Sequence, residues 1–292
     1  MSDLLFPPSL MEHMPAAGEL ILLPHGALNL IPFAALPSAS GEPLGRKYAL
    51  RYAPSLAMLA EVELRPSSIP PGARNAGLGR NLVIGNPTMP VVQSASGAGL
   101  PLSNLPGAEE EGAWIGERLG TTTLTGAAAN EPEVRLRLPE ATIVHLATHA
   151  FVYSSAERVA SSFIALAPAP GADGLLTIDE ILRETPALAA EIVALSACQT
   201  GLGEVSQSEG TVGLQRAFLA KGARSVLASL WSVSDEATAQ LMRRFYRARP
   251  TPRSGDGRSS ALPSRVETPL GAAALLSRSE RRHFRDGHQR SR

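Results

Sequence analysis

The sequence contains a single cysteine, Cys198, among its 292 residues. A lone cysteine excludes an intrachain disulfide and gives no indication of an oxidising compartment. The amino terminus lacks the basic region and apolar run of a signal peptide, and no stretch approaches the roughly 18 apolar residues that cross a bilayer. The sequence therefore predicts a cytoplasmic protein that does not contact a membrane.

Motifs for metals, nucleotides and nucleic acids are also missing. One cysteine cannot form a thiolate cluster, and His145 and His149 would lie about 13 Å apart on one strand, too far to share an ion. The glycine-rich fragments at 77–79 and 201–203 lack the residues that complete a phosphate-binding loop. We therefore expect no metal, no cofactor and no specific nucleic-acid partner.

Acidic and basic residues are equal in number, 27 of each, but they are unevenly distributed. Residues 1–246 carry 16 basic and 23 acidic side chains, whereas residues 247–292 carry 11 basic and 4 acidic ones. The composition thus predicts a domain over residues 1–247 and a basic tail of low order over residues 248–292. The tail has one aromatic residue, Phe284, and is interpreted as a solvated charge run.

Short apolar runs rich in Val, Ile and Leu alternate with segments of helical period. The runs at 142–148 and 192–197 are nearly all apolar, which is typical of parallel strands covered on both faces. The alternation predicts a mostly parallel sheet between two helical layers. The segment 87–106 is rich in proline, serine and glycine and is interpreted as one long loop. The remaining strands are expected at about 19–24, 48–53, 81–85, 121–125, 163–167 and 225–231, and helices at about 55–64, 107–119, 131–138, 177–184, 209–222 and 234–247.

Two of the central strands are expected to end in reactive side chains, His149 and Cys198. Ligands of open parallel sheets bind at the carboxyl ends of the strands. A nucleophilic cysteine needs a base that favours its thiolate, and a histidine ending the next strand meets that need. The backbone amides of Ala150 and Cys198 would then stabilise an oxyanion. On spacing alone, a small buried apolar residue is the commoner interpretation of such a cysteine. His145, in mid-strand, is interpreted as a hydrogen-bonded core residue.

Four separated stretches stand out in the sequence, namely LILLPHGALNLIPFAALP (20–37), HLATHAFV (145–152), LSACQTGLGE (195–204) and SEGTVGLQRAFLAKGARSVLASLWSVSDEATAQLM (208–242). Together they strongly resemble the CHAT domain family, which belongs to the caspase-like cysteine peptidases. The resemblance covers about residues 15–247. It implies an α/β fold, namely a caspase-like three-layer α/β/α sandwich with a mostly parallel central sheet.

The resemblance implies a function as well as a fold. The chain is expected to be a cysteine endopeptidase with a His149–Cys198 dyad and an oxyanion hole made by the amides of Ala150 and Cys198. The related separases cleave after arginine and hold an acidic residue in their specificity pocket. By similarity to them, Asp235 is the candidate substrate-binding residue, with cleavage after Arg or Lys. The alternative role of Asp235, from its position alone, is the N-cap of the helix that follows.

Two departures from the family pattern keep a second function open. Ala150 stands where the family usually has glycine, and the sequence after Arg247 lacks the family's last helix and strand. The alternative is therefore a catalytically degenerate CHAT domain that acts as a protein-interaction or regulatory scaffold. CHAT domains commonly follow helical repeats, whereas this sequence begins almost directly in the domain. The repeats are thus expected either to be missing or to lie on another chain that acts as a regulatory partner, and a protein or peptide substrate is expected in both cases.

Overall fold

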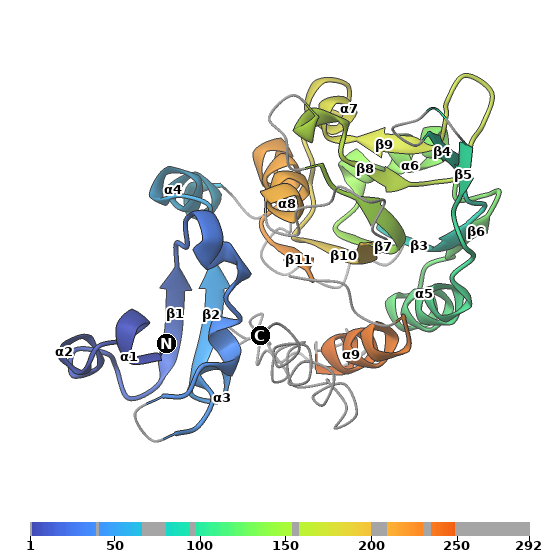
Figure 1. Ribbon diagram of the computed structural model, residues 1–292. Helices are drawn as coiled ribbons and strands as arrows, with labels where there is room; N and C mark the ends of the chain where they lie inside the picture. Colours follow the sequence, from blue (N-terminus) through green and yellow to red (C-terminus); the bar gives the residue numbers. More distant parts are fainter. Residues whose placement is uncertain are drawn as a thin grey trace, which may run out of the picture. The chain divides into compact units, whose positions relative to one another are not determined.

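A computed structural model describes residues 2–38, 41–65, 80–93, 97, 99–153, 158–199, 209–229 and 235–248 (Figure 1). These residues divide into two compact units, and each unit is described by itself. One unit contains Met1–Ile21 and Ile31–Arg51, and the other contains Leu22–Leu30 and the described chain from Tyr52 on. The basic tail expected over residues 248–292 lies outside the described residues, apart from Ala248.

The smaller unit is built around two hydrogen-bonded strands, β1 (Gly18–Leu22) and β2 (Tyr48–Tyr52). The rings of Phe6 and Phe33 pack edge to face, with centroids 6.1 Å apart. The sequence predicts both strands to within two residues but misses the short helical segments around them. Those segments are α1 (Ser2–Leu5), α2 (Pro8–Met11), η2 (Phe33–Ala35) and α3 (Leu44–Lys47). The short η1 (Gly26–Leu30) belongs to the larger unit.

The larger unit contains a seven-stranded sheet. Its strands are β3 (Asn81–Pro87), β6 (Leu124–Gly126), β7 (Ile143–Phe151), β8 (Phe163–Ala165), β9 (Leu175–Thr177), β10 (Ile192–Gln199) and β11 (Val226–Ala228). Five of them run parallel in the order β11-β10-β7-β3-β6. The strand β8 pairs antiparallel with the end of β7, and β9 pairs antiparallel with β8. The expectation of an α/β protein with a mostly parallel central sheet is therefore confirmed.

All six helices expected from the sequence are present, and each end lies within one residue of the expected position. They are α4 (Leu56–Leu64), α5 (Pro106–Leu119), α6 (Glu131–Arg137), α7 (Ile178–Arg183), α8 (Glu209–Lys221) and α9 (Asp235–Ala248), to which the short η4 (Leu138–Glu140) and η5 (Val159–Ser161) are added. Local signals explain the helix starts. The side chains of Ser55 and Asn130 cap α4 and α6, and Thr177 forms a capping box with Glu180 at the start of α7.

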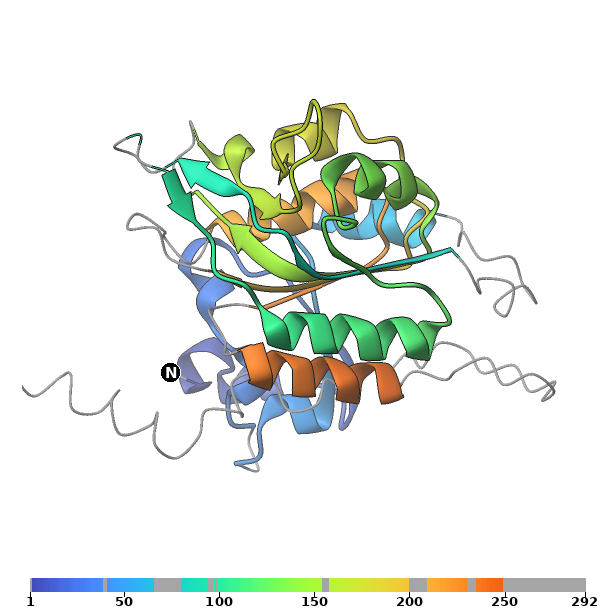
Figure 2. The same cartoon turned by 90° about the vertical axis from the view of Figure 1, so that its right-hand side faces the viewer.

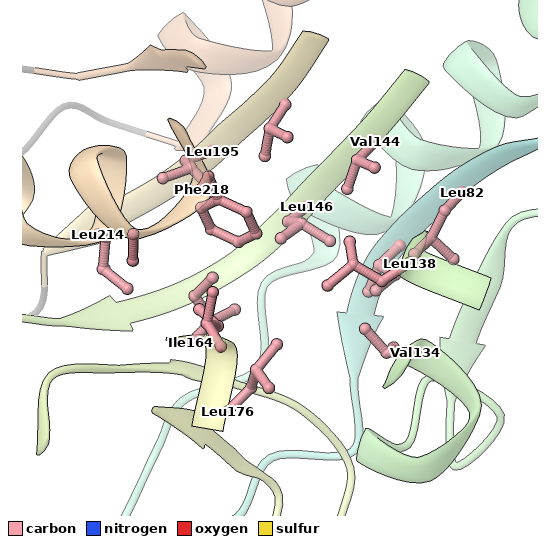
Figure 3. Packing of buried hydrophobic residues seen from close by; sticks show 14 of the residues in the cluster. Leu82, Val134, Leu138, Val144, Leu146, Ile164, Leu176, Leu195, Leu214 and Phe218 are labelled. Atoms are coloured by element: carbon pink, nitrogen blue, oxygen red, sulfur yellow. The ribbon is translucent and has the colours of Figure 1, made fainter. Parts of the chain in front are cut away.

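Apolar side chains pack on both faces of the sheet because successive residues of a strand point to opposite sides. Val144 and Leu146 of β7 belong to the same large cluster as Phe218 of α8, whose packing Figure 3 shows. On the opposite face, Val83 and Ile115 pack in a second cluster with residues of α9. The helices α5 and α9 lie side by side on that second face (Figures 1 and 2).

The expectation of a single long loop at 87–106 is wrong. The segment contains β4 (Val91–Gln93) and β5 (Gly99–Pro101), which pair antiparallel. Val92 is 2% exposed and packs in a cluster with Phe151 and Phe163, which anchors the hairpin next to the end of β7. Strands of three residues are too short for an alternating pattern to stand out against proline and glycine, so the composition of the segment misleads.

Arg135 of α6 is surrounded by the carboxylates of Glu131, Glu180 and Glu184. Glu131 is 2% exposed, and its Oε2 also accepts a hydrogen bond from the Gly174 amide at 3.1 Å. Burial, reinforced by the negative charge of Glu180, raises the pKa of Glu131 above its ordinary value of 4.5. Arg135 and the Gly174 amide oppose the shift without cancelling it.

This raised pKa predicts a loss of stability with rising pH. The folded protein holds the Glu131 proton more tightly than the unfolded chain, so the free energy of unfolding falls as pH rises from 4.5 through the raised value. In Glu131→Gln, which keeps an acceptor for Gly174, we expect that slope to disappear. Urea denaturation of both proteins over a pH series measures the difference. A wild type that gains stability relative to Glu131→Gln as pH rises would contradict the prediction.

Candidate active site

The carboxyl ends of β7 and β10 bring His149 and Cys198 together. The two strands are parallel neighbours, and their register pairs Cys198 with His149 and Gln199 with Ala150. Adjacent strands lie about 4.8 Å apart, so the two backbones are direct neighbours. The side chain of Cys198 is not among the described parts of the structure, and its placement here is that of its backbone.

The imidazole of His149 is buried, with 1% of the residue exposed. Its Nε2 lies 2.8 Å from the carbonyl oxygen of Ser103. A carbonyl can only accept, so Nε2 carries the proton and donates it. In the neutral ring, Nδ1 then holds the lone pair, and none of the described residues forms a hydrogen bond with Nδ1. The arrangement leaves a base with one nitrogen held and the other available for proton transfer.

Ser103 lies in the short connection between β5 and α5, next to Leu102, which packs in an apolar cluster. Phe151 and Phe163 stack with centroids 4.9 Å apart, and Leu102 packs against their cluster. The His149 ring lies beside Phe151, with centroids 6.3 Å apart. Apolar contacts thus hold one side of the imidazole, while a main-chain carbonyl fixes its rotation and tautomer.

The structure describes the other two predicted site residues, Ala150 and Asp235, in different detail. Ala150 is 5% exposed and lies inside the sheet, paired with Gln199 of β10 on one side and with Ile164 of β8 on the other. Its φ is not positive, because Asn86 is the one non-glycine residue with positive φ in the described chain. Asp235 is the first residue of α9, and its side chain lies outside what the structure describes. Its role in substrate binding therefore stays a prediction.

His145 lies on β7 four residues before His149, and it is a core residue as expected. It is fully buried, and its Nε2 donates to Oε1 of Glu111 at 2.8 Å. The hydroxyl of Tyr246 lies 3.3 Å from Nδ1 and donates to it. Glu111 is itself 1% exposed, so the pair is sealed between β7, α5 and α9. His145 stabilises the core under the site rather than contributing a second reactive imidazole.

Sequence reasoning missed Glu111 and Ser103. The burial of Glu111 could have been predicted from the helical period, because Glu111 falls three residues after Ala108 and four before Ile115, on the buried face of α5. The run of three glutamates instead indicates a helix N-terminus, where negative charge is favourable. Ser103 contributes only its backbone carbonyl, which any residue provides, so no residue type marks that position.

The described residues contain no group of three or more His, Cys, Asp or Glu side chains that could hold a metal ion. None of the described helices has both the length and the apolar character needed to cross a membrane.

The fold and the two reactive strand ends agree with a family match. The CHAT domain model matches residues 1–270, and the chain belongs to the CHAT domain family. The resemblance drawn from the sequence motifs is therefore confirmed.

Two curated relatives are tetratricopeptide repeat proteins. The chain is similar to tetratricopeptide repeat protein 28 of Homo sapiens, with 31% identity over 267 residues, and to the protein of the same name in Mus musculus, with 30% identity over 270 residues. Each alignment covers 78% of this chain and 10% of the relative. The chain thus spans about a tenth of the length of these relatives.

Proposed function

We propose that this chain is a cysteine endopeptidase whose dyad is His149 and Cys198. The observation that carries the proposal is the in-register pairing of these residues at the carboxyl ends of β7 and β10. The hydrogen bond from Nε2 to Ser103 supports it, because it leaves Nδ1 as the basic nitrogen. We further propose that the sheet and its helices form the caspase-like three-layer α/β/α sandwich, which the apolar clusters on both faces support.

In this mechanism Nδ1 of neutral His149 takes the thiol proton of Cys198, and the resulting thiolate attacks the scissile carbonyl carbon, so that the negative charge moves to the carbonyl oxygen. The amides of Ala150 and Cys198 stabilise that oxyanion. Collapse of the intermediate breaks the C–N bond while protonated His149 gives its Nδ1 proton to the leaving amine. His149 then takes a proton from water as the water attacks the thioester, and Cys198 leaves as the thiolate.

Cleavage after arginine or lysine is the specificity that we propose, with Asp235 as the acidic residue that binds the basic side chain. A carboxylate pairs well with guanidinium because two parallel hydrogen bonds form. The position of Asp235 at the first residue of α9 is compatible with this role. We further propose residues 1–247 as the peptidase domain, residues 248–292 as a separate basic tail and the cytoplasm as the compartment.

A helical-repeat regulatory partner is the second part of the proposal. The two relatives are named for tetratricopeptide repeats, and this chain aligns with only a tenth of each. Such a partner would act on the peptidase site by binding elsewhere on the domain. The partner and a protein or peptide substrate are thus expected to bind at different places.

The alternative function is a catalytically degenerate CHAT domain that serves as an interaction or regulatory scaffold. Ala150 in place of the family's glycine and the repeat-protein names of the relatives favour it. The two functions differ in what they require of Cys198. A peptidase needs a reactive thiolate there, and a scaffold does not.

A fluorogenic panel of arginyl and lysyl peptides tests the proposal, with Cys198→Ala as the matched control. We expect turnover by the wild type and none above background by Cys198→Ala. An arginyl electrophile is expected to label Cys198 faster than it labels a free thiol. Turnover that survives in Cys198→Ala would overturn the dyad, and labelling no faster than a free thiol would favour the scaffold.

A further inference from the structure

Asn86 adopts a backbone conformation that most residues avoid. Its φ is 48°, in the left-handed region, and it is the one non-glycine residue with positive φ in the described part of the chain. Asparagine tolerates this region better than other side-chain-bearing residues, for which it costs roughly 1–2 kcal/mol. Asn86 lies near the carboxyl end of β3, where the register against β6 shifts between Gly85 and Pro87. Irregular strand ends of this kind often redirect a side chain next to an active site.

The preceding residue explains how Asn86 reaches the start of α5. A Cβ on Gly85 would lie 2.7 Å from the carbonyl oxygen of Ala108, so only glycine lets the helix backbone lie this close to β3. The first turn of α5 therefore lies directly against the end of the strand. The side chain of Asn86 then meets the connection that leads into the helix.

Both polar atoms of the Asn86 side chain form hydrogen bonds with residues at the start of α5. Its Oδ1 accepts the backbone N–H of Leu105 at 2.9 Å, and its Nδ2 donates to Oε2 of Glu109 at 3.1 Å. Leu105 is the N-cap residue of α5, and its own side chain provides no capping bond. Its carbonyl accepts from Ala108 and Glu109, so Asn86 holds the residue from which the helix begins.

The segment from Leu102 to Leu105 is not deeply buried. Ser103 and Asn104 are exposed, and Leu102 and Leu105 are only partly buried. This same segment presents the Ser103 carbonyl, two residues before Leu105, to Nε2 of His149. A carbonyl on an exposed connection orients an imidazole only if its backbone is fixed. The Asn86–Leu105 hydrogen bond restrains this backbone at its helix end, and the packing of Leu102 against the cluster of Phe151 and Phe163 restrains it at the other end.

We propose that Asn86 is a positioning residue for His149. By holding the Leu105 amide, it keeps the Ser103 carbonyl in place to accept the Nε2 proton, and it thereby keeps Nδ1 as the basic nitrogen. Its effect on catalysis rests on the proposed peptidase function. Its effect on the His149 tautomer does not, because the tautomer can be measured in the absence of turnover.

The test compares three variants with the wild type by nitrogen NMR of protein labelled with 15N histidine, with His149→Gln used to assign the signal. In the wild type we expect His149 to be protonated at Nε2. Asn86→Gly tolerates the same φ but removes both hydrogen bonds, and we expect a mixture of tautomers and a fall in kcat/KM of about 10-fold, carried by kcat. Asn86→Asp in a Glu109→Gln background keeps the acceptor for Leu105 and is expected to restore the tautomer and the rate.

The matched control is Glu109→Ala, which removes the partner of Nδ2 but leaves the Leu105 bond, and it should keep the wild-type tautomer. A wild-type tautomer in folded Asn86→Gly would overturn the proposal. If Asn86→Gly does not fold, hydrogen exchange of the wild type decides, because the Leu105 amide must be protected. An unprotected Leu105 amide would also overturn it. A wild type without turnover but with the expected tautomers would contradict the peptidase function and leave Asn86 as the positioning residue.

Discussion

Replacing His149 with glutamine is expected to lower kcat/KM for an arginyl peptide about 10³-fold, within the range usual for loss of a general base. The substitution removes the Nδ1 lone pair, which none of the described residues occupies. It keeps an N–H donor that can reach the Ser103 carbonyl, so the buried acceptor is not left without a partner. The substitution is therefore expected to slow the chemical step without lowering the stability of the protein.

Two further measurements make the prediction specific. The double variant His149→Gln with Cys198→Ala should be no less active than Cys198→Ala alone, because residues that act as one unit do not contribute additively. Urea denaturation should give His149→Gln a stability within about 1 kcal/mol of the wild type. Activity retained by well-folded His149→Gln would show that the imidazole is not the base.

The largest effect on stability is expected from Glu111→Ala, which should cost about 3 kcal/mol. The substitution leaves the Nε2 proton of His145 without an acceptor in a fully buried position. It also separates elements that the pair joins, since Glu111 lies on α5, His145 on β7 and their neighbour Tyr246 on α9. Glu111→Gln keeps an acceptor oxygen and should cost only about 1 kcal/mol.

A double-mutant cycle with His145→Ala separates the contact from the general loss of packing. We expect a coupling energy of about 2 kcal/mol between Glu111 and His145, measured by urea denaturation. The matched control is Glu110→Ala on the same helix turn, because Glu110 is exposed and its ion pair with Arg243 is long, at 3.8 Å. A coupling near zero, or a Glu110→Ala variant as unstable as Glu111→Ala, would contradict the prediction.

The elements with strong local signals could be predicted from the sequence. The six longer helices begin or end at recognisable residues, such as Ser55 and Asn130 at their N-caps and Gly120 in the left-handed conformation after α5. The buried strands β7 and β10 are recognisable as continuous apolar runs. The strands β4, β5 and β9 could not be predicted, because each is three residues long and is not part of a longer apolar run, and β4 and β5 lie in a segment rich in proline, serine and glycine.

The candidate site divides in the same way. The neighbouring positions of His149 and Cys198 could be predicted because each follows a nearly continuous apolar run, and the register of β7 and β10 pairs the two residues. The contact of Ser103 with His149 could not be predicted, because it depends on the path of the β4–β5 hairpin, and the composition of that segment does not indicate a hairpin. Asn86 could not be predicted either, since its role follows from a left-handed φ that nothing in a single sequence specifies.

The group that orients His149 is a main-chain carbonyl, and this has a consequence for mutagenesis of this chain. No exchange of side chain at position 103 removes a carbonyl, so we expect an alanine scan to pass over Ser103. The proposed role of Asn86 instead puts the demand on position 86, where a short side chain must both accept the Leu105 amide and tolerate a left-handed backbone. A scan of side chains alone would thus attribute the orientation of the imidazole to Asn86 and miss the carbonyl that holds it.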